Sequence, residues 1–159
     1  MKFEFSNKTA LICGGSSGIG LAIAKTLEKH KKLKIILLSS NKKKLKEAKL
    51  SFKNPEKIDI YKVDLSKSSE VSKFIKKLSS DGIGIDILIN NSGGPKAGDI
   101  FNVDNADWEH AIQNNFLSHL NITKHCLNNM LKNNWGRIIN ITSTLAVEPT
   151  PSMIISASI

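Results

Sequence analysis

Residues 14–20 of the chain, Gly-Gly-Ser-Ser-Gly-Ile-Gly, have the residue types and the spacing of a turn that binds phosphate groups. A glycine-rich turn between a strand and a helix presents backbone N–H groups. The helix N-terminus adds a partial positive charge, so a diphosphate can bind there. Gly14 would allow a tight turn, Gly18 a close approach of the phosphates, and Gly20 close packing of the helix on the strand. The other candidate contacts in this turn are Ser16, Ser17 and Ile19.

Another phosphate-binding turn, the P-loop, has two glycines at the spacing of Gly15 and Gly20. That motif also needs a Lys and then a Ser or Thr after the last glycine, whereas Leu21 and Ala22 follow here. The P-loop is therefore excluded. A glycine-rich turn that binds no ligand remains as the alternative.

The rest of the chain alternates apolar segments with helical patterns along its whole length. The apolar segments, which predict strands, are residues 8–13, 34–38, 57–63, 85–89 and 137–141. The helical patterns lie at residues 18–30, 42–52, 68–78 and 105–132. This alternation predicts one α/β domain over residues 1–159, with a Rossmann-like, doubly wound parallel sheet of about five strands and flanking helices. Ligands bind such sheets at the carboxyl ends of the strands.

The bulk composition is that of an ordinary α/β domain, with 159 residues of which 40% are hydrophobic. No stretch approaches the ~20 apolar residues of a membrane span, and the first residues lack the apolar region of a secretory signal. Cys13 and Cys126 are too few for a disulfide framework and have no metal-ligand spacing. We therefore expect no metal, no membrane and a reducing cytoplasm.

The formal net charge of +9 raises the possibility of a nucleic-acid partner. Nearly all of this charge is lysine, Arg137 is the single arginine, and the densest runs, residues 29–34 and 42–46, fall at expected helix ends and turns. A nucleic-acid footprint gathers on one face with arginine or aromatic partners. We therefore expect no nucleic-acid partner.

The glycine spacing over residues 14–20, Gly-x-x-x-Gly-x-Gly, resembles that of the short-chain dehydrogenase/reductase family, with Cys13 in place of the usual Thr. Further motifs recur in the family's order. Residues 90–93, Asn-Asn-Ser-Gly, resemble its Asn-Asn-Ala-Gly turn, and residues 135–143 resemble its fifth strand and catalytic Ser. Gly94-Pro95, which follows this turn, resembles the Gly-Gly-Pro sequence of a divergent branch of the family. That branch is similar to the 3-oxoacyl-acyl-carrier-protein reductases and lacks the catalytic Tyr. The resemblance covers essentially the whole chain but about the first two thirds of a family member.

The resemblance implies cofactor contacts at the ends of the third and fourth strands. Asp64 would hydrogen-bond the adenine amino group, with a helix N-cap or turn role as the alternative. Gly93 would let the backbone approach the cofactor ribose. The other candidate contacts at these two places are Leu65, Asn90 and Ser92.

The resemblance also implies catalytic roles. Ser143 would donate a hydrogen bond to a substrate carbonyl oxygen. Asn115, seven residues after Trp108, would bind a water through its backbone, with a buried polar kink in the helix as the alternative. No His or acid lies at triad-like spacing from Ser143, so a hydrolase nucleophile is not expected.

The family's general acid, a Tyr, is absent. The position thirteen residues after Ser143 is Ser156, and the family's Lys would fall one residue past Ile159. A Ser hydroxyl is a far weaker acid than a phenol with a pKa of about 10, so Ser156 is no chemical replacement. The divergent branch also carries Ser at the Tyr position. We expect the chain to be a truncated product or fragment in which carbonyl reduction is impaired.

The cofactor expected from the sequence is NADP(H) rather than NAD(H). NAD-binding folds place an acid on the ribose hydroxyl about 20 residues after the glycines. Here Ser39 and Ser40 could bond a 2′-phosphate and Lys42 could neutralise it. The expected function is hydride transfer between NADP(H) and a small carbonyl or alcohol substrate, and full-length relatives are expected to be homo-oligomers. The alternative is a non-catalytic dinucleotide-binding or regulatory module of the same fold.

Overall fold

The computed structural model describes residues 5–159 and contains one parallel sheet of five strands. The strands are β1 (Thr9–Cys13), β2 (Lys34–Ser39), β3 (Ile58–Lys62), β4 (Ile87–Asn90) and β5 (Arg137–Asn140). They lie in the order β3-β2-β1-β4-β5, and every neighbouring pair is parallel. The order reverses between β1 and β4. The predicted doubly wound, Rossmann-like sheet is confirmed.

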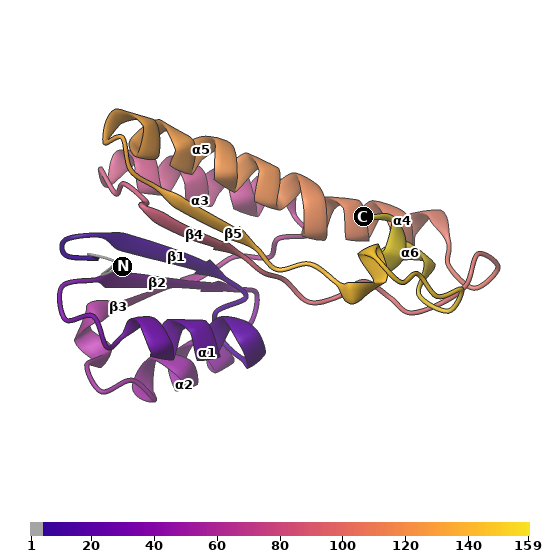
Figure 1. The fold of residues 1–159 in the computed structure, drawn as a ribbon, viewed down its shortest axis with the longest axis horizontal. Helices are drawn as coiled ribbons and strands as arrows, with labels where there is room; N and C mark the ends of the chain where they lie inside the picture. Colours follow the sequence, from indigo (N-terminus) through magenta and orange to yellow (C-terminus); the bar gives the residue numbers. More distant parts are fainter. Residues whose placement is uncertain (1–4) are drawn as a thin grey trace.

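Helices cover both faces of the sheet (Figure 1). They are α1 (Gly18–Leu27), α2 (Lys42–Leu50), α3 (Ser68–Ser80), α4 (Asn105–Ala111), α5 (Ser118–Lys132) and α6 (Ile154–Ser158). Shorter helical segments are η1 (Pro55–Lys57), η2 (Ile112–Leu117) and η3 (Thr144–Ala146). The helices α1 and α2 lie on one face, and α3 and α5 lie on the other.

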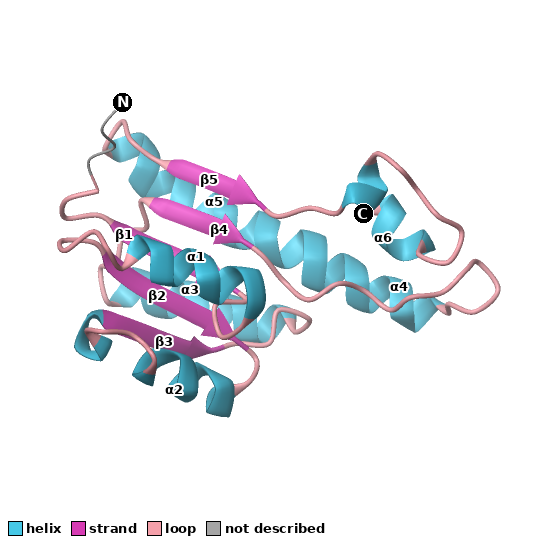
Figure 2. Cartoon of the chain, turned by 60° about the horizontal axis from the view of Figure 1, so that its bottom comes forward, coloured by secondary structure: helices cyan, strands magenta, loops and turns pink. Residues whose placement is uncertain are grey.

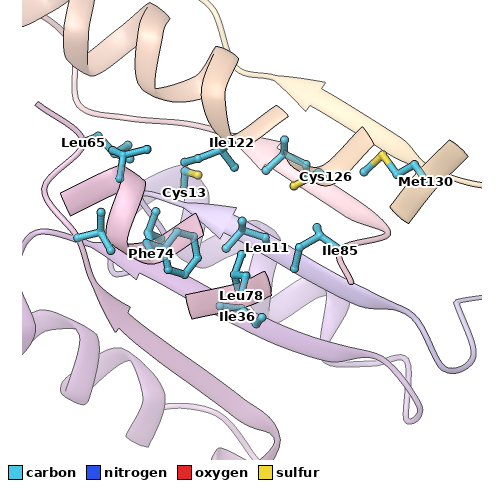
Figure 3. Close-up of a cluster of buried hydrophobic side chains, with 14 residues drawn as sticks. Leu11, Cys13, Ile36, Leu65, Phe74, Leu78, Ile85, Ile122, Cys126 and Met130 are labelled. Atoms are coloured by element: carbon cyan, nitrogen blue, oxygen red, sulfur yellow. The ribbon is translucent and has the colours of Figure 1, made fainter. Parts of the chain in front are cut away.

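The sheet is buried on both faces, as its continuously apolar strands predict. On one face α3 and α5 pack Phe74, Leu78 and Ile122 against Leu11 of β1 and its neighbours (Figure 3). On the other face, a second apolar cluster joins α1 and α2 to the same strands. All four residues of β4 are buried, whereas β5 at the edge is largely exposed. The core therefore centres on β2, β1 and β4.

Several predicted boundaries shift by a few residues. The first helix ends at Leu27 rather than residue 30, and the second at Leu50 rather than residue 52, because each closes in a turn. The fourth strand begins at Ile87 rather than residue 85, and the Asp86 side chain just before it accepts the Thr9 N–H at 3.0 Å. The sequence assigned no element after residue 141, whereas the structure adds η3 and α6.

The long helix predicted over residues 105–132 consists of three consecutive segments, α4, η2 and α5. The middle segment, η2, is a π-helix that contains Asn115. The Ser118 hydroxyl donates to the Asn114 carbonyl at 2.7 Å, so a side chain satisfies a backbone group of this irregular turn. Single π turns inside α-helices often lie at functional sites.

The first part of this long helix extends past the carboxyl end of the sheet, where α6 lies beside it (Figure 2). The backbone of Gly98, which follows β4, pairs with the segment before α6: Gly98 N–H donates to Ser152 at 2.8 Å, and Ile154 N–H donates to Gly98 at 3.1 Å. These contacts join the segment at the start of α6 to the loop after β4, beyond the carboxyl end of the sheet. Within residues 5–159, no helix is both long and apolar enough to cross a membrane.

The burial of β4 predicts a large stability effect at Leu88, which is fully buried at 0% exposure. Leu88→Ala removes buried methyl groups from the middle of the sheet, so we expect the free energy of unfolding to fall by about 2–5 kcal/mol. Urea unfolding followed by circular dichroism measures this. Leu50→Ala, at a leucine that is 76% exposed at the end of α2, is the control and should change stability by less than about 0.5 kcal/mol. Equal losses in the two variants would contradict the placement of the core.

Candidate functional site

A cavity of about 450 Å³ opens at the carboxyl ends of the strands, where the strand order reverses between β1 and β4. Open α/β sheets bind ligands at this place. Its lining residues are Gly14, Ser16, Ser17, Gly18, Ile19, Ser39, Ser40, Val63, Asp64, Leu65, Asn91, Ser92, Gly93 and Asn114. Eleven of the fourteen cofactor-contact candidates are in this lining. Gly20, Lys42 and Asn90 are not, while Val63, Asn91 and Asn114 were not predicted.

The glycines of residues 14–20 take three different roles. Gly14 has φ +62°, and a Cβ there would meet the carbonyl oxygen of Asn91 at 2.9 Å. Gly18 has φ +54°, yet a Cβ on it would meet no described atom within 4 Å. At Gly20 a Cβ would collide with the carbonyl of Gly14. Gly14 and Gly20 therefore hold the turn together, whereas Gly18 leaves open space beside the cavity.

The N-terminus of α1 faces this cavity with its backbone donors uncapped. Ser17, the N-cap residue, is extended (φ −162°, ψ 174°) and makes no side-chain cap bond among the described residues. The first turn of α1 also holds no acidic residue. The first N–H groups of a helix have no intrahelical partner, so in α1 they remain available to an anion.

Ser16 links the glycine turn to the end of β2. Its hydroxyl donates to the Ser39 hydroxyl at 2.8 Å, and Ser39 also accepts the Asn41 N–H at 3.3 Å. With both acceptor sites of Ser39 used, its own proton is left to donate to a ligand. Asn41 caps α2 by accepting the Lys44 N–H at 3.0 Å, and the exposed Lys42 begins that helix outside the cavity lining.

Asp64 has the turn role that was the alternative expected from the sequence, and it also lines the cavity. Its carboxylate accepts hydrogen bonds from the Ser66 hydroxyl at 2.7 Å and the Ser66 N–H at 3.1 Å, which is the geometry of a turn residue. Lys67 lies 3.6 Å from the other carboxylate oxygen. These hydrogen bonds from Ser66, followed by the charge of Lys67, lower the pKa of Asp64 below its ordinary value. Asp64 nevertheless lines the cavity, as an ionised acceptor.

The two asparagines that end β4 tie three strands together. Asn91 donates from Nδ2 to the Cys13 carbonyl at the end of β1, at 3.2 Å. Asn90 donates to Thr123 of α5 at 3.0 Å and to Asn140 of β5 at 2.8 Å. Asn90 is buried and lines a second cavity rather than the first.

The second cavity, of about 710 Å³, continues from the first past Ile19, Asn91 and Ser92, which line both. It brings together all three catalytic candidates, Ser143, Asn115 and Ser156. Its walls are mainly apolar, with Phe116, Leu120, Ile141, Leu145, Met153 and Ile159 among them. The arrangement can hold a polar group at the strand ends inside an apolar pocket.

The Ser143 side chain caps η3 as a hydrogen-bond acceptor, so its hydroxyl proton remains available to donate. Its oxygen accepts the Leu145 N–H at 3.1 Å, so the hydroxyl is held in place and can donate into the second cavity. Ser156 reaches the same cavity from α6. Tyr61, the single tyrosine, packs against Phe74 with a ring separation of 5.2 Å and lines neither cavity.

His119 is a cavity residue that the sequence did not predict. Its Nε2 lies 3.3 Å from the Ser92 hydroxyl, and burial lowers the pKa of His119 to about 4. Asn115 donates from Nδ2 to the same hydroxyl and to the Gly93 carbonyl, both at 2.9 Å. The available signal was the four-residue spacing of Asn115, His119 and Thr123, which places polar side chains on one helix face.

Known proteins share this fold and these motifs. The profile described as short chain dehydrogenase matches residues 8–158. Nodulation protein G of Rhizobium sp. (strain N33) is 33% identical over 149 residues, which cover 94% of this chain and 60% of that protein. The 3-oxoacyl-acyl-carrier-protein reductase FabG of Rickettsia typhi is 32% identical over 148 residues, which cover 93% of this chain and 58% of that protein.

Among solved structures, L-sorbose reductase from Gluconobacter frateurii, complexed with NADPH and L-sorbose, superimposes with a TM-score of 0.88 at 28% identity. That match covers 99% of this chain and 60% of the reductase. The chain therefore spans about three fifths of the length of these relatives. With the profile matching nearly all of its residues, the chain belongs to the short-chain dehydrogenase family.

Proposed function

We propose that the chain binds the dinucleotide NADP(H) across its two cavities, and that the reaction of its site, hydride transfer with a carbonyl or alcohol substrate, is impaired in this chain. The observation that carries the proposal is the glycine turn at the uncapped N-terminus of α1. The residues fit a diphosphate, since the open space at Gly18 admits phosphate oxygens and the first N–H groups of the helix face them.

The proposed preference for the 2′-phosphate rests on the end of β2. Ser39 and Ser40 both line the first cavity, and Ser39 has a proton to donate. No carboxylate ends β2, so nothing there repels a phosphate. Lys42 contributes positive charge at longer range, because it stands outside the lining.

In the proposed reaction the bound cofactor supplies or accepts the hydride, and the chain orients the substrate. Ser143 donates a hydrogen bond to the substrate oxygen, which stabilises the negative charge that develops as a carbonyl is reduced. Asn115 holds the turn at Gly93 in place beside the cofactor. The relatives named above include two reductases, which supports a carbonyl substrate.

A dinucleotide-binding module without turnover is the second candidate, and the serine at position 156 favours it. A positioned acid typically accelerates a reaction 10²- to 10⁴-fold, and a Ser hydroxyl is too weak an acid to supply that contribution. The two candidates differ in turnover and agree on binding.

We also propose that the chain acts on a small molecule in the cytoplasm and has no nucleic-acid partner. Both cysteines are buried as free thiols, and burial raises the pKa of each, which fits a reducing compartment. Among residues 5–159, no lysine or arginine lines either cavity, so the charge of the chain does not gather at the proposed site.

The glycine turn gives the first test of binding. Gly18→Val should abolish NADPH binding, measured by nicotinamide fluorescence, because a branched side chain would fill the phosphate position. Gly82→Val is the matched control: Gly82 also has positive φ, at +63°, and open space around it, but it lies outside both cavities. Both variants should lose similar stability from backbone strain, about 1–2 kcal/mol. Unchanged NADPH affinity in Gly18→Val would overturn the phosphate site.

The end of β2 gives the test of cofactor choice. The unmodified chain should bind NADPH more tightly than NADH, by a margin that shrinks with added salt because the phosphate contact is partly Coulombic. Ser39→Asp should reverse the order, since a carboxylate repels the 2′-phosphate and accepts the ribose hydroxyls. Ser51→Asp, which adds the same charge at the other end of α2, should leave the order unchanged. Equal affinities for NADPH and NADH in the unmodified chain would contradict the assignment.

Turnover separates the two candidates. We expect the chain to bind NADPH without measurable reduction of generic ketones or aldehydes, because no phenol or other suitable acid lies in the second cavity. NADPH oxidation followed by absorbance measures this, with Ser143→Ala as the comparison. If the chain reduced a simple ketone at a rate that Ser143→Ala left untouched, the proposed role of Ser143 would be wrong.

A further inference from the structure

The hydroxyl of Ser92 stands at the boundary of the two cavities and is held there by two side chains of the long helix. It accepts a hydrogen bond from Asn115 Nδ2 at 2.9 Å and lies 3.3 Å from His119 Nε2. Asn115 also fixes the neighbouring Gly93 carbonyl at 2.9 Å. Three contacts thus lock a short turn that lines both cavities.

The hydrogen-bond capacities of these groups decide where the Ser92 proton can go. A hydroxyl accepts two hydrogen bonds and donates one, and a neutral imidazole donates from one nitrogen only. If His119 donates from Nε2, both acceptor sites of Ser92 are filled and its proton is free for a ligand. If His119 is protonated at Nδ1 instead, that N–H is buried without a partner among the described atoms. In the first tautomer Nδ1 is an unpaired buried acceptor instead, which is less unusual in folded proteins than an unpaired buried N–H.

The position of Ser92 selects the ligand group that would meet this proton. Along a dinucleotide, the diphosphate separates the adenosine from the ribose that carries the nicotinamide. With the diphosphate at residues 14–20 and the adenosine toward Ser40 and Asp64, the ribose is the next group to pass from the first cavity into the second. Ile19, Asn91 and Ser92 line that passage, and Ser92 is the member with a hydroxyl.

We propose that Ser92, positioned by Asn115 and His119, donates a hydrogen bond to a hydroxyl of the nicotinamide-side ribose. This assignment rests on the proposed function. The family's Asn-Asn-Ala-Gly turn has an alanine at this position, and an alanine side chain could not make the hydrogen bond. The competing role is structural: Ser92 would then only tie the turn after β4 to the long helix, without touching a ligand.

Three ligands separate these roles in binding titrations: NADPH, 2′-phospho-ADP-ribose, which lacks the nicotinamide, and 2′-phospho-ADP, which also lacks that ribose but keeps the diphosphate. Ser92→Ala should weaken NADPH and 2′-phospho-ADP-ribose by about three- to tenfold, the range of one hydrogen bond, and leave 2′-phospho-ADP unchanged. Ser40→Ala, the matched control at the adenosine end, should weaken all three ligands alike. Thermal unfolding of both variants checks that each remains folded.

His119 is tested by keeping or removing its donor. His119→Gln retains an N–H near the Nε2 position and should keep the ligand affinities, whereas His119→Leu should weaken the two ribose-containing ligands, as Ser92→Ala does. Combined in one chain, Ser92→Ala and His119→Leu should cost little more than Ser92→Ala alone, since both act through one hydrogen bond. Nitrogen NMR of His119 should show the neutral Nε2–H tautomer with NADPH bound.

Each outcome decides between the assignments. The ribose contact is overturned if Ser92→Ala lowers the affinity equally for all three ligands, for none of them, or for NADPH alone. An Nδ1–H tautomer in the complex, or a His119→Gln affinity as low as that of His119→Leu, overturns the positioning role of His119. If the unmodified chain binds none of the three ligands, the proposed function itself fails, which is a different result from binding that is insensitive to Ser92.

Discussion

The turn after β1 packs so closely against the turn after β4 and the first turn of α1 that two glycine positions, Gly14 and Gly20, admit no side chain. A Cβ on Gly14 would run into Asn91, and a Cβ on Gly20 would run into the carbonyl of Gly14. The Asn91 side chain then donates to the carbonyl of Cys13 across the same junction. These contacts join the ends of β1 and β4 where the strand order reverses and form one wall of the first cavity. The N-terminus of α1 and the turn at Ser92 continue directly from the two joined turns.

The surface and the site differ in electrostatic character. The chain carries a formal net charge of +9, yet among the described residues Asp64 is the one with a charged side chain in the linings of the two cavities of the candidate site. That carboxylate already accepts a hydrogen bond from the Ser66 hydroxyl and lies beside the ammonium group of Lys67. An anionic ligand in these two cavities would therefore be held by backbone N–H groups and hydroxyls rather than by paired cations. Hydrogen-bond donors act only at short range and must be placed accurately around the anion. Anion binding would therefore depend more on the conformation of the glycine turn than on the number of lysines.

The order of strands and helices, the two-sided burial and the glycine turn could be predicted because each has a local sequence signal. Asn91 lies within the motif at residues 90–93, but its hydrogen bond to Cys13 joins residues 78 positions apart. No local spacing in the sequence indicates a contact over that distance. His119 was missed for a related reason. Which face of the long helix meets the cavity depends on the rotation through the π-helix η2, and a regular 3.6-residue pattern does not contain that turn.

The absence of a phenol in the second cavity makes the source of the proton the limiting question for catalysis. His119 does not answer it: with a pKa of about 4, only about one molecule in a thousand carries the imidazolium proton at pH 7. Ser143 and Ser156 are both too weak as acids. In the proposed reaction, water that enters the second cavity could protonate an alkoxide that Ser143 stabilises. The described groups of this cavity are better suited to orienting a substrate oxygen than to transferring a proton, and the proposed function requires only that orientation of them.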